Sequence, residues 1–87
     1  MEMSLLTFTN THFAIKAEQL LQKAALPVAP MPLPVKLGGS LCGICLRISQ
    51  ADTTVALQLL ADGGAAPATV YRISESEGNK EYLPWPN

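Results

Sequence analysis

The order of apolar patterns along the chain constrains its fold more than any single motif. Alternating apolar residues are typical of a half-buried strand, whereas apolar residues three and four apart are typical of an amphipathic helix. In chain order the sequence predicts a strand at 3–9, a helix at 11–25, a strand at 28–33, a strand at 43–48, a helix at 50–61 and a strand at 68–73. The pattern is therefore strand, helix, strand, strand, helix, strand.

Polar and helix-breaking residues support the predicted helix ends. Asn10 or Thr11 can cap the first helix by accepting a hydrogen bond from an unpaired backbone N–H, and Pro27 stops it. Residues 49–52 resemble a capping box with Asp in place of Glu, and residues 63–64 are a Gly-Gly stop. The first helix is expected to bury a stripe of Phe13, Ala17, Leu20 and Ala24 flanked by Ala14 and Leu21, and the second to bury Val55, Ala56, Leu59 and Leu60.

The second predicted strand contains Pro30 and Pro32. A proline has no backbone N–H to donate to a sheet, and two prolines two residues apart lack it on the same side. This pattern predicts an edge strand.

The element order predicts an α+β fold of the ferredoxin-like βαββαβ type, with a four-stranded antiparallel sheet and two helices on one face. The first and third strands would then be central. The loop before the third strand would lie at the same end of the sheet as the start of the first helix. We expect one domain at residues 1–73 and a loosely attached C-terminal tail at 74–87.

Composition excludes several classes of protein. With 6 basic and 7 acidic residues among 87, the net charge of −1 argues against nucleic acid or a membrane surface as an electrostatic partner. The sequence shows no signal peptide and no apolar run long enough to cross a membrane, so a cytoplasmic location is expected. Two cysteines three residues apart do not form a secreted disulfide framework.

Cys42 is the strongest candidate for chemistry. It ends a Gly-Gly loop where an apolar strand begins, and a thiolate next to a helix N-terminus or a cation has a lowered pKa. The other interpretation is a small apolar residue at a strand start. Strand alternation sends Cys42 and Cys45 to opposite faces, which argues against a redox disulfide. A thioredoxin-like redox pair and a copper-chaperone-like metal site remain minor alternatives.

Other residues near this loop could assist a thiolate. His12 could act as its base or its cation, although a lone histidine is more often a surface residue. Thr11 is a further candidate, with a capping role as the alternative. Gly38, Gly39 and Ser40 could bind an anion through backbone N–H groups, or they could form only a flexible turn. No nucleotide or dinucleotide fingerprint is present, so no cofactor or metal is expected.

Several short segments together resemble a known family. They are Thr7-Phe8-Thr9-Asn10-Thr11-His12-Phe13-Ala14, Ala17-Glu18, Cys42-Gly43-Ile44 with Leu46-Arg47, and Val70-Tyr71-Arg72. In this order and spacing, over about residues 3–73, the chain resembles the putative selenium/sulfur carrier protein-like family. Members commonly have a small residue where this chain has Cys45, so the second cysteine is a departure.

The resemblance implies a small carrier that holds sulfur or selenium on Cys42, activated by His12 and the helix start, and not a turnover enzyme. It also implies a cysteine desulfurase-type donor and an acceptor in selenium or sulfur metabolism. The alternative is a non-catalytic binding or dimerisation module with structural cysteines. We also expect the sheet face opposite the helices to be covered, by the tail or by a symmetric homodimer. That face is predicted to carry Leu5, Thr7, Cys45, Arg47 and Tyr71.

Overall fold

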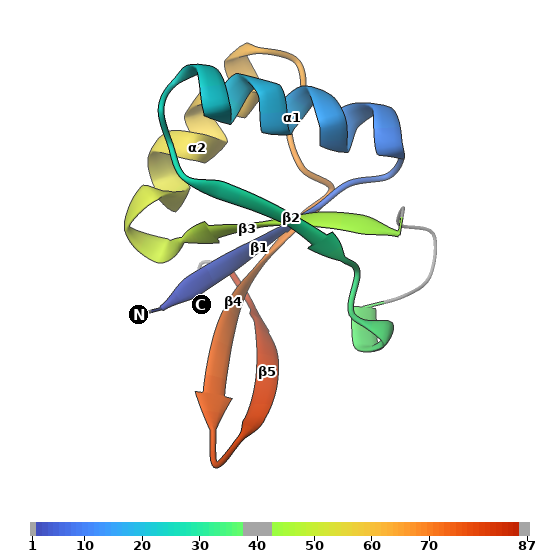
Figure 1. Ribbon diagram of the computed structural model, residues 1–87, viewed down its shortest axis with the longest axis vertical. Helices are drawn as coiled ribbons and strands as arrows, with labels where there is room; N and C mark the ends of the chain where they lie inside the picture. The colour runs from blue at the N-terminus through green and yellow to red at the C-terminus, as the bar shows by residue number, and fades with distance from the viewer. Residues whose placement is uncertain (1, 38–42, 86–87) are drawn as a thin grey trace.

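The computed structural model describes residues 2–37 and 43–85, with only the backbone described at Ser76. The elements are β1 (Met3–Thr7), α1 (Thr11–Lys23), β2 (Val28–Pro32), the 3-10 helix η1 (Val35–Leu37), β3 (Ile44–Ser49), α2 (Gln50–Asp62), β4 (Thr69–Ser76) and β5 (Asn79–Pro84). Both α-helices lie on one side of a single antiparallel sheet, and the β4–β5 hairpin, which forms one edge of the sheet, extends away from the helices (Figure 1). The predicted α+β class and the two helices on one face are therefore observed.

The sheet has five strands in the order β2-β3-β1-β4-β5, so the expectation of four strands was wrong. It departs from the four-stranded ferredoxin-like sheet by the strand added beside β4. The residues expected to form a loose tail instead extend β4 to Ser76 and build β5. A two-residue turn joins them, because Ser76 pairs with Asn79 and both Glu77 and Gly78 have positive φ, 52° and 81°. Two residues of positive φ give the turn twist that antiparallel hairpins favour.

The central strand β1 is buried on both faces. Leu6 is paired with Leu46 of β3 and Val70 of β4 on the helix side, and Leu5 is paired with Arg47 and Tyr71 on the opposite side. The predicted assignment of residues to the two faces is therefore confirmed. The core between the sheet and the helices consists of small and aliphatic side chains around one phenylalanine, namely Leu6, Phe8, Ala14, Ala17, Leu21, Leu46, Ile48, Ala56, Leu60 and Ala65.

The buried stripe of each helix differs in part from the predicted one. On α1 the buried residues are Ala14, Ala17 and Leu21, whereas Phe13 and Ala24 are exposed. This face is rotated by about one residue from the predicted stripe, which alanines at 14 and 17 allow because both are small enough to lie against the sheet.

On α2 the predicted burial of Val55 was wrong, because its side chain is 55% exposed, and Leu59 is half-buried. The buried residues are Thr53, Ala56 and Leu60. Thr53 is buried in place of an apolar residue because its hydroxyl donates to the carbonyl of Ser49 at 3.0 Å. A threonine that satisfies its hydroxyl within the helix can occupy an apolar face.

The two helices begin and end in the same way. Asn10 caps α1 by accepting from the N–H of Phe13 at 3.0 Å, and Ser49 caps α2 by accepting from the N–H of Ala51 at 3.2 Å. Each C-terminus closes with a Schellman pattern, in which the second residue after the cap donates back to the last turn: Leu26 to Leu21 at 3.0 Å and Ala65 to Leu60 at 2.8 Å.

The Schellman pattern requires a left-handed backbone at the residue after the cap. In α2 this residue is Gly64, with φ 75°. In α1 it is Ala25, with φ 61°, which is unfavourable for any residue that has a Cβ. The helix therefore ends before Pro27, at a residue whose backbone is strained.

The prolines of β2 lie at the sheet edge, as predicted. The N–H of Leu33 donates to the carbonyl of Gly43 at 2.8 Å, so odd-numbered residues of this strand point their N–H groups toward β3. By strand alternation, the nitrogens of Pro30 and Pro32 point away from the sheet. Their missing donors therefore fall on the outer edge.

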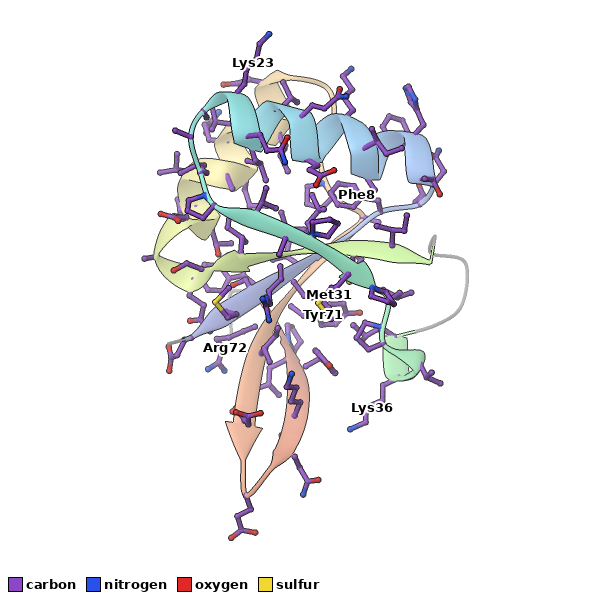
Figure 2. The ribbon with its side chains drawn as sticks, viewed as in Figure 1. Phe8, Lys23, Met31, Lys36, Tyr71 and Arg72 are labelled. Carbon is purple, nitrogen blue, oxygen red and sulfur yellow. The ribbon has the colours of Figure 1, made fainter. Side chains whose placement is uncertain are left out.

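The sheet face opposite the helices is covered at its centre within a single chain. Leu5, Thr7 and Cys45 are fully buried, while Tyr71 is half-buried and Arg47 is exposed. The side chains of Met31 and Tyr71 lie on this side of the sheet (Figure 2). The ammonium group of Lys36 in η1 donates to the carbonyl of Lys80 in β5 at 3.3 Å, which links the two segments below the sheet. A second copy of the chain is not needed to bury the centre of this face, and the homodimer stays a prediction.

Candidate functional site

The predicted site residues lie at the end of the sheet where β1 leads into α1. Thr7 of β1 is paired with Cys45 of β3, and the two strands are antiparallel. The chain therefore enters β3 from Gly43 at the same end where it leaves β1 for the first turn of α1 (Figure 1). The predicted juxtaposition of the start of β3 with the start of α1 is present.

The first turn of α1 is open to solvent. Asn10 provides the cap, Thr11 is the first helical residue, and Thr11 and His12 are both exposed. The ring of His12 packs beside the ring of Phe13 with 5.8 Å between centroids. This turn contains no acidic residue, so no carboxylate of the turn offsets the partial positive charge of the helix N-terminus.

Cys42 and the proposed anion-binding residues Gly38, Gly39 and Ser40 lie outside the described residues. The described chain resumes at Gly43, which is exposed. Apart from its two chain neighbours, no atom of the described residues lies within 4 Å of a Cβ built at Gly43.

Cys45 is in a different environment. Its side chain is fully buried on the face opposite the helices, and its thiol lies 3.6 Å from the carbonyl oxygen of Met31 and 3.7 Å from that of Pro32. A buried thiol that donates to backbone carbonyls is shielded from solvent reagents. These contacts indicate a structural role for Cys45 at the junction of β2 and β3.

A neighbouring buried polar group is also satisfied. The hydroxyl of Thr7 accepts from the N–H of Thr69 at 3.1 Å and contacts the Thr69 hydroxyl. It therefore belongs to the β1–β4 pairing.

Within residues 2–37 and 43–85 no group of three or more His, Cys, Asp or Glu side chains is arranged to hold a metal ion. In the same part of the chain, neither helix combines the length and the apolar character needed to span a bilayer.

The sequence prediction missed a second polar cluster, at the other end of β1. Charged side chains of three strands line a cavity of about 400 Å³ there, beside the β4–β5 hairpin. Its lining consists of Glu2, Met3, Arg47, Arg72, Ile73, Ser74, Glu75 and Lys80. The pairing of β1 with β3 and with β4 would have placed the strands of Arg47 and Arg72 on either side of β1, but Lys80 could be placed only by recognising β5.

Comparison with known proteins decides the family. Residues 3–72 match the model of the family described as putative Se/S carrier protein-like. The chain belongs to this family. The expected resemblance is thereby confirmed, and the match to the Se/S carrier-like family spans β1 to β3, both helices and the first half of β4 but not β5. No curated protein and no solved structure matches the chain significantly.

Proposed function

We propose that this Se/S carrier-like protein holds a sulfur or selenium atom on Cys42 and passes it between partner enzymes. The family match over residues 3–72 is the observation that carries the proposal. The exposed N-terminus of α1 and the exposed Gly43, which follows Cys42 in the sequence, lie at the same end of the sheet and support it. The buried position of Cys45 supports the choice of Cys42 over Cys45 as the carrier.

The loading step is a thiol exchange. The Cys42 thiolate attacks the outer sulfur of a donor persulfide, R–S–SH, and the sulfur–sulfur bond of the donor breaks. The inner sulfur of the donor leaves as the thiolate R–S⁻, and Cys42 becomes a persulfide that keeps the transferred sulfur and its proton. No external oxidant is needed, because one sulfur–sulfur bond is exchanged for another. Transfer to an acceptor thiolate is the same step in reverse.

The start of α1 would favour the thiolate in this step. Unpaired N–H groups at a helix N-terminus stabilise a nearby negative charge, and the first turn of α1 has no acidic residue. His12 is exposed on this turn and would act as the cation or base, and Thr11 would donate its hydroxyl to the transferred atom. The Gly38-Gly39-Ser40 segment would add backbone donors.

The partners follow from this chemistry. A cysteine desulfurase-type enzyme would supply the persulfide, and an acceptor in selenium or sulfur metabolism would take the atom. A reducing cytoplasm would keep Cys42 available as a thiol between cycles. The protein would act as a carrier and not as a turnover enzyme.

Loading with a small-molecule persulfide and intact-mass measurement test the proposal. The wild type and Cys45→Ala are expected to gain one sulfur atom, and Cys42→Ser is expected to gain none. The added atom should be removed by a reductant. Loading of Cys42→Ser to the same extent as the wild type would contradict the proposal.

The role of His12 has its own test. The rate of iodoacetamide reaction at Cys42 would be measured against pH in the wild type and in His12→Gln, with Gln22→Ala, at an exposed α1 position, as control. We expect the pH midpoint of the His12→Gln profile to move upward, because a thiolate that loses a cation is stabilised less. Identical profiles would show that His12 takes no part, and equally slow reaction of Cys42 and Cys45 in the wild type would favour the binding-module alternative.

A further inference from the structure

The cavity at the start of β1 is distinct from the cysteine end of the molecule. It lies beside Glu2 and Met3, whereas Cys45 and Gly43 lie beside and beyond Thr7 at the opposite end of the strand. Four strand steps separate Met3 from Thr7, which corresponds to about 14 Å. A ligand in this cavity would therefore bind away from Gly43 and Cys45, and the cavity is not explained by the carrier proposal.

Arg72 has an unfulfilled hydrogen-bonding requirement at this cavity. It lines the cavity and its side chain is half-buried, and among the described residues its buried Nε has no hydrogen-bond partner. Buried polar groups are nearly always hydrogen-bonded, and those that are not call for an explanation such as a ligand.

The charge of the lining favours an anion. Arg47, Arg72 and Lys80 contribute three positive charges from three different strands, against two negative charges from Glu2 and Glu75. Charged groups brought together from separate strands are held by the sheet and not by a single flexible segment. The rigid fork of a guanidinium group, with its Nε–H, is suited to binding two oxygens of a phosphate or a carboxylate.

The size of the cavity narrows the ligand class. A volume of about 400 Å³ lies within the range of small-molecule sites and exceeds that of an inorganic ion alone. Three cations also suit a tetrahedral dianion better than a carboxylate, which has one negative charge and two oxygens. We infer that this cavity, with Arg47, Arg72 and Lys80, is a binding site for a small molecule that carries a phosphate group.

Titration of the ¹⁵N-labelled full-length protein with inorganic phosphate, pyrophosphate and acetate at low ionic strength tests the inference. Amide shifts confined to residues 2–3, 47, 72–75 and 80 would place the ligand in the cavity. We expect pyrophosphate to bind most tightly and acetate to bind at least about tenfold more weakly than phosphate. Acetate binding as tightly as phosphate would overturn the assignment of ligand class, and no saturable shift with any anion would overturn the site.

Variants separate the site from general surface charge. Arg72→Gln and Arg72→Lys should each weaken phosphate binding by about tenfold or more, since lysine keeps the charge but loses the fork. Glu75→Gln should tighten binding by removing a competing carboxylate. Lys23→Gln is the control, because it removes one positive charge from the exposed end of α1, across the molecule from Arg72 (Figure 2).

Lys80→Gln provides a test that does not depend on the half-buried arginine, because Lys80 is exposed on the hairpin. It is expected to weaken binding, by less than the Arg72 variants. Equal weakening by Lys23→Gln and Lys80→Gln would show that phosphate responds only to net charge, and would overturn the inference. Unchanged binding in Cys42→Ser is expected, since this site is independent of the carrier function.

Discussion

The strained end of α1 predicts that the protein is stabilised when Ala25 is replaced by glycine. Ala25 has φ 61°, in the left-handed region, where a residue with a Cβ is less stable than glycine by about 1–2 kcal/mol. Its side chain is exposed, so removal of the methyl group loses little packing. Glycine also increases the entropy of the unfolded chain, which offsets about 0.4–1 kcal/mol of the gain. The net expected effect of Ala25→Gly is a stabilisation of roughly 0.5–1 kcal/mol.

The other helix supplies the matched control. Gly64 occupies the same position after α2, with φ 75°, and a Cβ built there would lie 3.6 Å from the Lys16 ammonium, an ordinary contact. Gly64→Ala therefore adds the same backbone strain without a steric clash and should destabilise the protein by about 1 kcal/mol. Ala24→Gly is the second control, because Ala24 has an ordinary φ of −85° and gains nothing from glycine.

Urea unfolding followed by circular dichroism measures these effects. We expect the midpoint to rise for Ala25→Gly and to fall for Gly64→Ala, with the denaturant slope unchanged in both. For a chain of this size each kcal/mol shifts the thermal midpoint by about 4–8 °C. An Ala25→Gly protein no more stable than the wild type, or one matched by Ala24→Gly, would refute the assignment of strain to Ala25.

Four further changes have expected outcomes. Ser4→Ala should raise the free energy of unfolding by about 1 kcal/mol, because it removes a buried hydroxyl that has no partner among the described residues. A lower free energy of unfolding in urea denaturation would instead indicate a bound water or ligand at that hydroxyl. Asn10→Ala should lower the free energy of unfolding by about 1 kcal/mol, because the α1 cap is lost, whereas Asn10→Asp should leave the free energy of unfolding unchanged. Thermal melts of the two variants compare these effects. Cys45 should react with a thiol reagent much more slowly in the native protein than in urea, and mass spectrometry can follow both reactions. Equal rates would contradict the burial of Cys45. Removal of residues 77–87 should lower the free energy of unfolding by roughly 2 kcal/mol or more, because β5 is lost together with the half-buried Tyr82, Leu83 and Trp85. An unchanged urea midpoint would show that β5 adds no stability.

The first four strands could be predicted because each has a simple pattern. Alternation identified both faces of β1, and the paired prolines identified β2 as an edge strand. The fifth strand was missed for two reasons. Its turn, Glu77-Gly78, lacks the usual Asn-Gly or Asp-Gly signal, and Pro84 at its end argues against a strand when only the sequence is considered.

The helix faces were less predictable, because α1 buries two alanines and one leucine. With such small residues, the apolar periodicity of the sequence does not distinguish the buried face of the helix from a face rotated by a single residue. The juxtaposition of Gly43 with the start of α1 followed from the order of elements alone. The cavity around Arg72 did not, because it depends on Lys80 of β5, a strand that the sequence prediction missed.

The two edges of the sheet have a consequence for how copies of this protein can meet. On β2 two of the three outward positions are Pro30 and Pro32, which offer acceptors but no donors, and the third is Val28. On β5 the outward carbonyl of Lys80 is taken by the Lys36 ammonium, and Pro84 removes an outward donor. Both edges therefore offer fewer donors to a further strand than an ordinary edge does, which disfavours edge-to-edge growth of the sheet. A homodimer through the helices or the covered face is then expected in preference to one that joins two sheets edge to edge.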